Sequence, residues 1–277
     1  MMTAERLEAL AALCRTFRRD VLTAIYEAQS GHPGGSLSVC EILTALYFEH
    51  LRVYPQDPAR EDQDRLVLCK GHAAPMLYRV LAERGYFPVS EFMTTLRRLD
   101  SRMQGHPSIH TPGVDMPSGP LGIGMGAAQG MAMGMKLKGL DQRAYAVLGD
   151  GELNEGAVWE TAMSAPKSGL HNLIAIVDRN NVQLDGTVEE IMPTEPLADK
   201  WRAFGWNVLE CDGHDLMDLD RALTAAKAEQ DKPSVILART VKGKGVSFME
   251  GKNTWHGKVL SREDYEAAME ELGGEAQ

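Results

Sequence analysis

Residues 144–186 read AYAVLGDGELNEGAVWETAMSAPKSGLHNLIAIVDRNNVQLDG and contain two short apolar runs, Tyr145–Leu148 and Leu173–Val177. Both runs are rich in aliphatic residues, which favours buried β-strands. The segment between them, Leu153–Ser168, has the length and composition of a helix. Strand, helix and strand in this order predict a parallel βαβ unit, in which the carboxyl ends of the two strands meet at one edge of the sheet.

A carboxylate follows the first run and an amide follows the second. Asp150 lies between Gly149 and Gly151, and the second run leads into Asp178-Arg179-Asn180-Asn181. Carboxylate and amide oxygens suit a hard cation such as Mg²⁺, and flanking glycines let the backbone approach a phosphate. The pair therefore predicts a site for a metal and a diphosphate. The alternative is two ordinary turns in which Asp and Asn serve as caps.

Composition limits the classes of protein to which the chain can belong. It has 277 residues, 44% of them hydrophobic, and a formal net charge of −10, which argues against nucleic acid as the main partner. The four cysteines show no metal-ligand spacing, and the amino terminus does not resemble a signal peptide. We expect a cytoplasmic protein in a reducing compartment, without a membrane partner.

Further helices and strands alternate along the chain. Apolar residues from Leu7 to Ile25 have the spacing of an amphipathic helix that ends near Gly31 and Pro33. Ser38 with Glu41 resembles a capping box for a second helix that continues to about His50. Other expected helices are 73–84, 197–204, 216–228 and one from Ser261, and other expected strands are 65–69, 207–211 and 234–240. Residues 100–120 and 242–257 are expected loops. The pattern predicts an α/β fold, a doubly wound parallel sheet with helices on both faces, forming a single domain over 1–277 with an extended helical amino-terminal region.

The most apolar stretch, Pro120–Met135, has glycines at positions 122, 126, 130 and 134. It is shorter than the roughly 20 residues that span a bilayer, so we expect a fully buried helix. Each glycine lowers helix stability by about 1 kcal/mol, which close packing would have to offset. A protein–protein interface is a plausible place for this glycine stripe.

Seven collinear motifs carry a resemblance to a known family. The chain resembles the amino-terminal, thiamine-diphosphate-binding part of transketolase through SGHPGG 30–35, KGHAAPMLY 70–78, QGHP 104–107, SGPLGIG 118–124, GDGELNEGAVWE 149–160, DRNNVQLDG 178–186, and KGKG with WHGK within 242–258. Deoxyxylulose-phosphate synthases share some of these features. The 2-oxoacid dehydrogenases share the central metal motif.

The resemblance covers nearly the whole chain, yet the family's pyrimidine-binding and carboxyl-terminal domains have no counterpart before Gln277. Residues 273–277 have the composition of a polar tail. The resemblance therefore implies the amino-terminal subunit of a split transketolase. Its partner would be a separate chain with the missing domains, and the expected assembly is a heterotetramer with two copies of each chain.

The resemblance also implies the cofactors and the residues that bind them. The cofactors are thiamine diphosphate and Mg²⁺, with Ca²⁺ or Mn²⁺ as possible substitutes. The implied metal ligands are Asp150, the side chain of Asn180 and the backbone carbonyl of Val182. The implied cofactor contacts are His72, Gly119, Pro120, Leu121, Gly151, Glu155, Asn180, Lys242 and His256. Glu155, expected in the first turn of the crossover helix, could instead be an acid favoured near a helix start, and Lys242 could be a solvated loop lysine.

Four of the eight histidines lie inside the family motifs, and the resemblance implies that they are catalytic: His32, His72, His106 and His256. His72 and His256 would flank the diphosphate, whereas His32 and His106 would contact the hydroxyls of a sugar. A neutral imidazole can donate or accept a hydrogen bond, which suits this work. The other histidines, at positions 50, 110, 171 and 214, are expected to be structural.

The implied activity is transfer of a two-carbon ketol unit from a ketose, expected to be a sugar phosphate, to an aldose. The chain alone would be inactive, because the glutamate that helps to activate the cofactor lies on the pyrimidine-binding domain. A modified sugar, sulfonated, deoxy or branched, stays open as substrate. The alternatives are a subunit of a deoxyxylulose-phosphate-synthase-like enzyme and a non-catalytic module that binds the cofactor and stabilises or regulates a partner.

Overall fold

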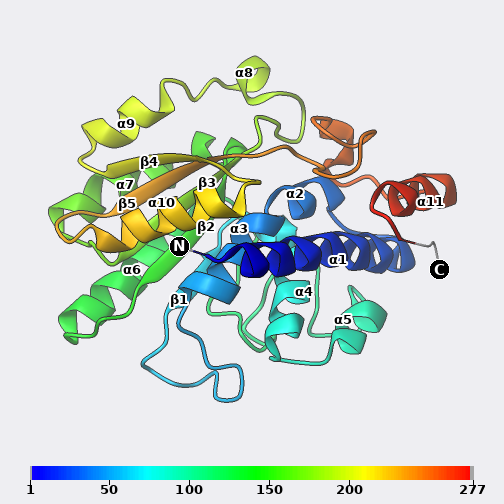
Figure 1. Ribbon diagram of the computed structural model, residues 1–277. Helices are drawn as coiled ribbons and strands as arrows, with labels where there is room; N and C mark the ends of the chain where they lie inside the picture. Colours follow the sequence, from blue (N-terminus) through cyan, green and yellow to red (C-terminus); the bar gives the residue numbers. More distant parts are fainter. Residues whose placement is uncertain (1, 275–277) are drawn as a thin grey trace.

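The computed structural model describes residues 2–274, which form a parallel α/β sheet with helices on both sides (Figure 1). The strand order in the sheet is β1-β2-β3-β5-β4, and all neighbouring strands are parallel. The predicted fold class is confirmed. Positions 275–277 of the expected polar tail lie outside the described residues.

The strands are β1 (Arg65–Leu68), β2 (Ala144–Gly149), β3 (Leu173–Arg179), β4 (Asn207–Asp212) and β5 (Ser234–Arg239). The helices are α1 (Ala4–Ala28), α2 (Pro33–Ser38), α3 (Cys40–Ala45), α4 (Ala74–Arg84), α5 (Val89–Thr95), α6 (Ile123–Leu137), α7 (Gly156–Lys167), α8 (Val188–Ile191), α9 (Leu197–Ala203), α10 (Leu216–Ala228) and α11 (Arg262–Glu271). One π-helical turn, η1 (Leu46–His50), and three 3₁₀ turns, η2 (Gly71–Ala73), η3 (Gly151–Asn154) and η4 (Asn253–His256), complete this part of the chain.

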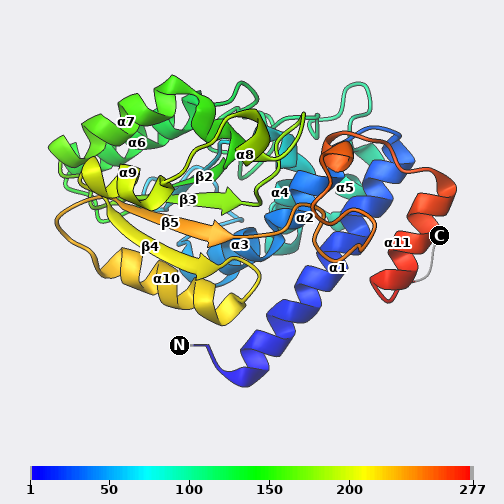
Figure 2. The ribbon, with the colours of Figure 1, turned by 90° about the horizontal axis from the view of Figure 1, so that it is seen from above.

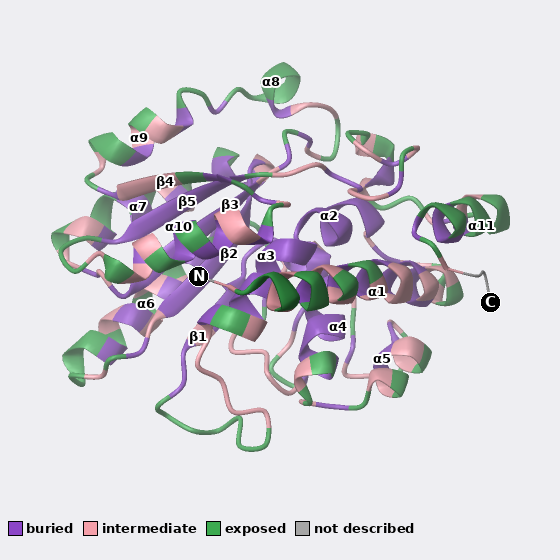
Figure 3. Ribbon diagram, viewed as in Figure 1, coloured by how far each residue is buried: buried purple, intermediate pink, exposed green. Residues whose placement is uncertain are grey.

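Two hydrophobic layers hold the sheet. Alternate strand residues such as Tyr145 and Ile174 face α1, α3, α4 and α10, whereas their neighbours such as Ala146 and Ala175 face α6, α7 and α9. Figure 2 shows these two helix layers on opposite sides of the strands. The sheet is buried almost throughout, and the exposed positions lie mainly on the outer helices and loops (Figure 3).

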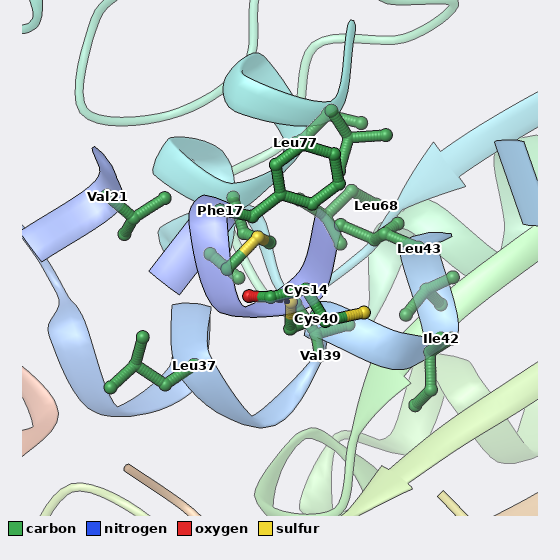
Figure 4. Close-up of a cluster of buried hydrophobic side chains, with 14 of the residues drawn as sticks. Cys14, Phe17, Val21, Leu37, Val39, Cys40, Ile42, Leu43, Leu68 and Leu77 are labelled. Carbon is green, nitrogen blue, oxygen red and sulfur yellow. Dashed lines mark hydrogen bonds between the residues drawn. The ribbon is translucent and has the colours of Figure 1, made fainter. Parts of the chain in front are cut away.

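The larger layer is centred on α1, whose inward face carries Cys14, Phe17 and Val21 (Figure 4). These side chains pack with Leu43 of α3 and Leu77 of α4, and all five are at most 2% exposed. Burial of a large apolar side chain contributes about 1.5–3 kcal/mol to folding. This packing fixes α3 and α4, and so fixes the segment that enters α4 from β1.

The carboxyl ends of the strands all point to one edge of the sheet. In Figure 2 the arrowheads of β3, β4 and β5 point toward α2 and α8. The segments that leave this edge carry the predicted site residues: Lys70–His72 follows β1, Asp150 follows β2, Asn180 follows β3 and Lys242 follows β5. Ligands of open α/β sheets bind at this edge, so the fold places these residues where a site is expected.

The prediction of a single helix capped by Ser38 and Glu41 was wrong. Ser38 is the last residue of α2, and its buried hydroxyl donates to the Asp178 carboxylate at 2.6 Å. The Glu41 carboxylate instead pairs with the Arg18 guanidinium on α1, with both of its oxygens within 2.7 Å. Both side chains are thus used for tertiary contacts, and the segment is divided into α2, α3 and η1.

The crossover between β2 and β3 also differs from the predicted continuous helix. It begins with η3 and continues as α7 after a break at Glu155, whose backbone is extended with ψ 126°. Glu155 is therefore the residue before α7 and does not lie in its first turn. The short helices α5 and α8 were not predicted, because neither is long enough to show a helical period.

The prediction that the glycine-rich helix is fully buried was wrong for this chain. α6 packs Met125, Ala128 and Ala132 against the sheet, but Gly126, Gly130 and Gly134 are exposed. No atom lies within 4 Å of a Cβ built on Gly130 or Gly134. Close packing within residues 2–274 therefore does not explain Gly130 and Gly134, whereas a Cβ on Gly126 would lie 3.4 Å from Thr161 Oγ1. In the described residues, no helix is long and apolar enough to cross a membrane.

Candidate functional site

A cavity of about 160 Å³ lies at the carboxyl edge of the sheet. Its wall is built from the loops that follow β1, β2, β3 and β5, together with the first turn of α2. The predicted site residues in this wall are His72, Leu121, Asp150, Gly151, Asn180, Val182, Lys242 and His256. Residues that are distant in the sequence therefore meet at one place.

Asp150 is a buried carboxylate, 3% exposed, at the end of β2. Oδ1 accepts a hydrogen bond from the Gly151 amide at 2.9 Å, and Oδ2 accepts one from the Asn181 amide. Burial, together with the nearby Asp178 carboxylate, raises the pKa of Asp150 to about 7. Burial makes ionisation of this carboxyl group costly, and a nearby cation would favour its ionised form.

Asn180 and Val182 lie on the turn that follows β3. Asn180 Oδ1 accepts from the Val182 amide at 3.1 Å, and Asn181 between them has a left-handed backbone with φ 67°. The Val182 carbonyl accepts from Lys242 Nζ at 3.2 Å. A carbonyl oxygen has two lone pairs, so this lysine and a metal ion can bind the same oxygen.

The donor set fits a divalent metal bound with a diphosphate. Asp150, Asn180 and Val182 line one wall of the cavity, and their carboxylate, amide and carbonyl oxygens are of the kind that hard cations prefer. Lys242 and Lys70 add two cations to the same wall. The absence of a side chain at Gly151 lets the loop after β2 pack closely against the loop after β3, because a Cβ at this position would lie 2.8 Å from Gln183 Cβ.

The four motif histidines form one cluster around His32. The centroid of the His32 ring lies 5.6 Å from that of His72, 6.0 Å from that of His106 and 5.4 Å from that of His256. The centroids of His72 and His256 are 4.9 Å apart. His32 Nδ1 is buried and has no hydrogen-bond partner within residues 2–274. The cluster thus offers polar ring atoms to a small polar ligand.

These imidazoles are neutral near pH 7. Burial, with Arg97 nearby, lowers the pKa of His32 to about 4, and burial beside Lys242 lowers the pKa of His256 to about 3. The pKa values of His72 and His106 are lowered too, mainly by burial. Lys242 Nζ lies 3.0 Å from His256 Nδ1, so the ammonium donates to this nitrogen and the ring proton is on Nε2.

We expect His32 and His256 to stay neutral when the pH falls from about 8 to about 5. The folded-state pKa of each lies below the usual 6.5. Below pH 6.5 the unfolded chain binds protons that the folded chain does not, so this pair lowers the free energy of unfolding as the pH falls toward 4. Histidine C2-proton shifts measured by NMR against pH test this. A midpoint near 6.5 for either ring would contradict the neutral cluster.

Some predicted residues lie beside the cavity and do not line it. Gly119 packs against His106, and a Cβ on Gly119 would lie 3.5 Å from its ring. Pro120 and His106 are exposed at the mouth. Glu155 is exposed and stands next to Gly122, where a Cβ would approach Glu155 Cβ to 2.6 Å. The face that holds Pro120 and Glu155 is open to solvent in this chain.

The structure adds a buried carboxylate that sequence reasoning missed. Glu152, 2% exposed, accepts from the Gly122 amide at 2.9 Å and from the Gly149 amide at 3.2 Å. It thereby ties the loop before α6 to the end of β2. Burial raises the pKa of Glu152 to about 7. No signal in the sequence distinguished it from an ordinary acid at a helix start.

The histidines expected to be structural lie outside the cluster. His50 is buried beside Asp220, with 3.1 Å between His50 Nε2 and Asp220 Oδ1. His214 connects the Glu41 carboxylate, 2.8 Å from Nδ1, to the Val241 amide, 2.8 Å from Nε2. His110 is exposed and His171 is partly exposed. None of the four lines the cavity.

Comparisons with known proteins agree with this arrangement. The family model described as the thiamine diphosphate binding domain of transketolase matches residues 10–277. The 6-deoxy-6-sulfo-D-fructose transketolase subunit SqwG of Clostridium sp. is 47% identical over 92% of this chain and 93% of its own length. An apulose-4-phosphate transketolase subunit of Phocaeicola vulgatus is 40% identical over 96% of this chain and 95% of its own length.

The fold is also that of solved transketolases. The transketolase of Campylobacter jejuni superposes with a TM-score of 0.89 at 34% sequence identity. The match covers 99% of this chain but 44% of that longer chain. The chain is therefore similar over its length to the two subunits, and to less than half of the longer enzyme.

Proposed function

The chain belongs to the family of transketolase thiamine-diphosphate-binding domains, and we propose that it is the cofactor-binding, amino-terminal subunit of a two-chain transketolase. The pyrimidine-binding and carboxyl-terminal domains would be supplied by a separate chain. The observation that carries the proposal is the cavity in which Asp150 and Asn180 lie at neighbouring strand ends beside the ring cluster of His32, His72 and His256. A non-catalytic module has no chemical need for this combination.

The cofactor would be held by the wall of the cavity. Asp150, Asn180 and the Val182 carbonyl would hold Mg²⁺, for which Ca²⁺ or Mn²⁺ could substitute, and the metal would offset the charge of the diphosphate. Bound thiamine diphosphate supplies the carbanion chemistry that breaks and forms the carbon–carbon bond. Lys242, His72 and His256 face the diphosphate and offset its charge or donate hydrogen bonds to it, while Gly151 gives it room. Gly119, Pro120 and Leu121 contact the rest of the cofactor at the mouth.

The histidines would form hydrogen bonds with the substrate and transfer its protons. His32 and His106 accept from or donate to sugar hydroxyls, because a neutral imidazole has one nitrogen of each kind. His72 and His256 can move a proton to or from the carbonyl oxygen that becomes a hydroxyl during ketol transfer. General acid–base assistance of this kind contributes about 10²–10⁴-fold in rate.

The partner chain would complete the site from the open face. Glu155 stands exposed on this face, consistent with a role in ordering the cofactor and in contact with the second active site. The glutamate that helps to activate the cofactor would come from the partner's pyrimidine-binding domain. The single chain would therefore bind the cofactor weakly and would not turn over.

The substrate class we propose is a ketose with an anionic terminal group. Both subunits to which this chain is similar are named for such sugars, one sulfonated and one phosphorylated. The histidine cluster faces the uncharged donor end of the sugar, so it does not distinguish phosphate from sulfonate. The partner chain would contact the anionic end.

We expect ketol transfer only when both chains are present. The purified chain, its candidate partner from a neighbouring reading frame, and an equimolar mixture are each assayed with thiamine diphosphate and MgCl₂. The donors are xylulose 5-phosphate, fructose 6-phosphate, 6-deoxy-6-sulfofructose and apulose 4-phosphate. Each is offered with the aldose acceptor ribose 5-phosphate, and the ketose formed from the acceptor is measured together with the carbonyl fragment left from the donor. The mixture should exceed either chain by about 10³-fold or more.

Other results of this assay would reject the proposal. Robust transfer by the single chain would show that no partner is needed. A parallel reaction offers pyruvate and glyceraldehyde 3-phosphate, and their condensation would instead identify a deoxyxylulose-phosphate-synthase-like subunit. Assembly with the partner without turnover of any of these substrates would favour a non-catalytic module.

The assembly would be a heterotetramer that covers the exposed glycine stripe of α6. We expect Gly130→Leu to leave the fold of this chain intact, since a Cβ there meets no atom within 4 Å, and to add up to about 1 kcal/mol of helix stability. The same change should prevent assembly, measured by native mass spectrometry. Thr224→Leu, an equally exposed change on α10, is the control. Normal assembly of Gly130→Leu would place the interface elsewhere.

A further inference from the structure

A buried ion pair lies directly under the cavity. The side chains of Lys70, after β1, and Asp178, in β3, are 1% and 0% exposed, and Lys70 Nζ contacts Asp178 Oδ2. Neither residue is among the predicted metal, cofactor or catalytic residues. A fully buried pair of charges is a poor way to stabilise a fold, because desolvation offsets much of the attraction. The pair therefore calls for a role other than stability.

Every polar atom of the pair is used. Lys70 Nζ also donates to the Gly35 carbonyl at 3.1 Å and contacts Ser38 Oγ at 3.3 Å. Ser38 Oγ donates to Asp178 Oδ2 at 2.6 Å, and Thr240 Oγ1 donates to Asp178 Oδ1. The network thus joins four segments of the chain that are far apart in sequence.

Each joined segment carries a predicted site residue close by. Lys70 lies two residues before His72, Asp178 two before Asn180, and Thr240 two before Lys242. Gly35 and Ser38 belong to α2, which begins directly after His32. Residues this close in the backbone cannot move independently. A displacement of any partner of the pair therefore displaces a site residue.

We propose that Lys70 and Asp178 are positioning residues that fix the relative placement of the segments carrying His32, His72, Asn180 and Lys242. Their importance for catalysis rests on the proposed function, but their effect on the four segments does not. The geometry favours this role because the groups that contact the two charges come from four segments of the chain and not from a single helix or strand. Lys70 is paired with Asp178 and not with Asp150. Asp150 has no lysine or arginine within salt-bridge distance in residues 2–274, and it is the carboxylate that faces the cavity.

The experiment removes both charges together, so that no charge is left unpaired. The full-length double variant Lys70→Met with Asp178→Asn is compared with the wild type by hydrogen–deuterium exchange and by thermal unfolding, without cofactor. We expect exchange to become about tenfold faster or more in segments 32–39, 70–74, 178–183 and 240–245, with little change in α1 and α4. The Tm should stay within a few degrees, as for other neutral replacements of buried pairs.

A matched control uses the ion pair of Arg79 on α4 and Asp20 on α1, which lies away from the cavity. Arg79 also pairs with Glu83 at 2.8 Å, so the control neutralises all three groups, and Arg79→Met with Asp20→Asn and Glu83→Gln should leave exchange in the four segments unchanged. Equal loosening of the four segments in this control, or uniform loosening over the whole chain in the Lys70 variant, would reduce the buried pair to an ordinary structural contact and overturn the proposal. Wild-type exchange in the Lys70 variant would overturn it too.

A second variant keeps the test decisive if the double variant does not fold. Thr240→Val removes one hydrogen bond to Asp178 and leaves both charges in place. It should speed exchange in 240–245 and weaken binding of thiamine diphosphate with MgCl₂ to the two-chain enzyme by about tenfold. Unchanged exchange and unchanged affinity would contradict the positioning role. Failure of the chain to bind this cofactor at all would reject the proposed function. The hydrogen–deuterium exchange result would still test whether the ion pair positions the four segments.

Discussion

Replacing Asp150 with alanine is expected to abolish Mg²⁺-dependent binding of thiamine diphosphate. Asp150 supplies the single carboxylate among the three proposed metal ligands, and the remaining amide and carbonyl oxygens carry no charge. We expect the affinity of the two-chain enzyme to fall by about 100-fold or more, which corresponds to about 2.7 kcal/mol or more. Titration calorimetry with and without MgCl₂ measures this loss.

The control for this variant is Asp185→Ala, which removes an exposed carboxylate from the loop that carries Asn180. It should bind the cofactor as the wild type does. A second readout separates loss of the site from loss of the fold. The folded-state pKa of Asp150 is raised to about 7, so ionisation of Asp150 disfavours the folded chain increasingly as the pH rises from 3.8 through 7.

The metal-free Asp150→Ala chain should therefore unfold no earlier than the wild type at about pH 8, because removal of the buried charge offsets the two lost hydrogen bonds to Gly151 and Asn181. Addition of MgCl₂ and thiamine diphosphate should raise the Tm of the wild type and not that of the variant. Cofactor binding retained by Asp150→Ala would move the metal site away from the end of β2.

The location of the site followed from the sequence because of one geometric rule. Parallel strands bring their carboxyl ends to one edge, so Asp150 and Asn180 had to be close once both apolar runs were recognised as strands. The glycines and prolines around His32, His72 and His106 marked loops, and the family resemblance assigned these loops to the same site. The ring distances in the structure agree with that assignment.

The residues that support the site could not be predicted in this way. Glu152, Lys70 and Asp178 act through partners 30 to 108 positions away, and neither periodicity nor turn chemistry carries information over such separations. The wrong capping box has the same cause. Ser38 and Glu41 have the correct spacing for a cap. In the structure, however, Ser38 donates a hydrogen bond to Asp178 and Glu41 pairs with Arg18, so neither side chain caps a helix.

The glycine stripe shows a different limit. The four-residue spacing predicts that another surface approaches α6 closely, either by burial of the whole helix or at a protein–protein interface. The spacing alone does not show whether the approaching surface belongs to the same chain or to another one. Because Gly126, Gly130 and Gly134 are exposed, contact with a neighbouring chain is the better explanation, which the Gly130→Leu variant tests.

Replacing His32 with alanine is expected to lower kcat of the two-chain enzyme by about 10²-fold or more while changing the affinity for thiamine diphosphate by less than about threefold. His32 lies at the centre of the ring cluster but is not among the residues that line the cavity with Asp150 and Asn180, which agrees with the proposed contact with the sugar and not with the diphosphate. His72→Ala, which alters that wall, should weaken cofactor binding as well.

Steady-state kinetics and cofactor titration on the same preparations separate these two effects. His110→Ala removes an exposed imidazole four residues beyond His106 and should leave both quantities unchanged. The neutral state of His32 adds a further constraint, because its pKa is lowered to about 4 and the ring cannot act as a permanent cation at neutral pH. His32→Gln, which keeps one donor and one acceptor without charge, should therefore recover more activity than His32→Lys. Equal activity of the glutamine and lysine variants would mean that the neutral hydrogen-bonding group at this position is not what the reaction uses.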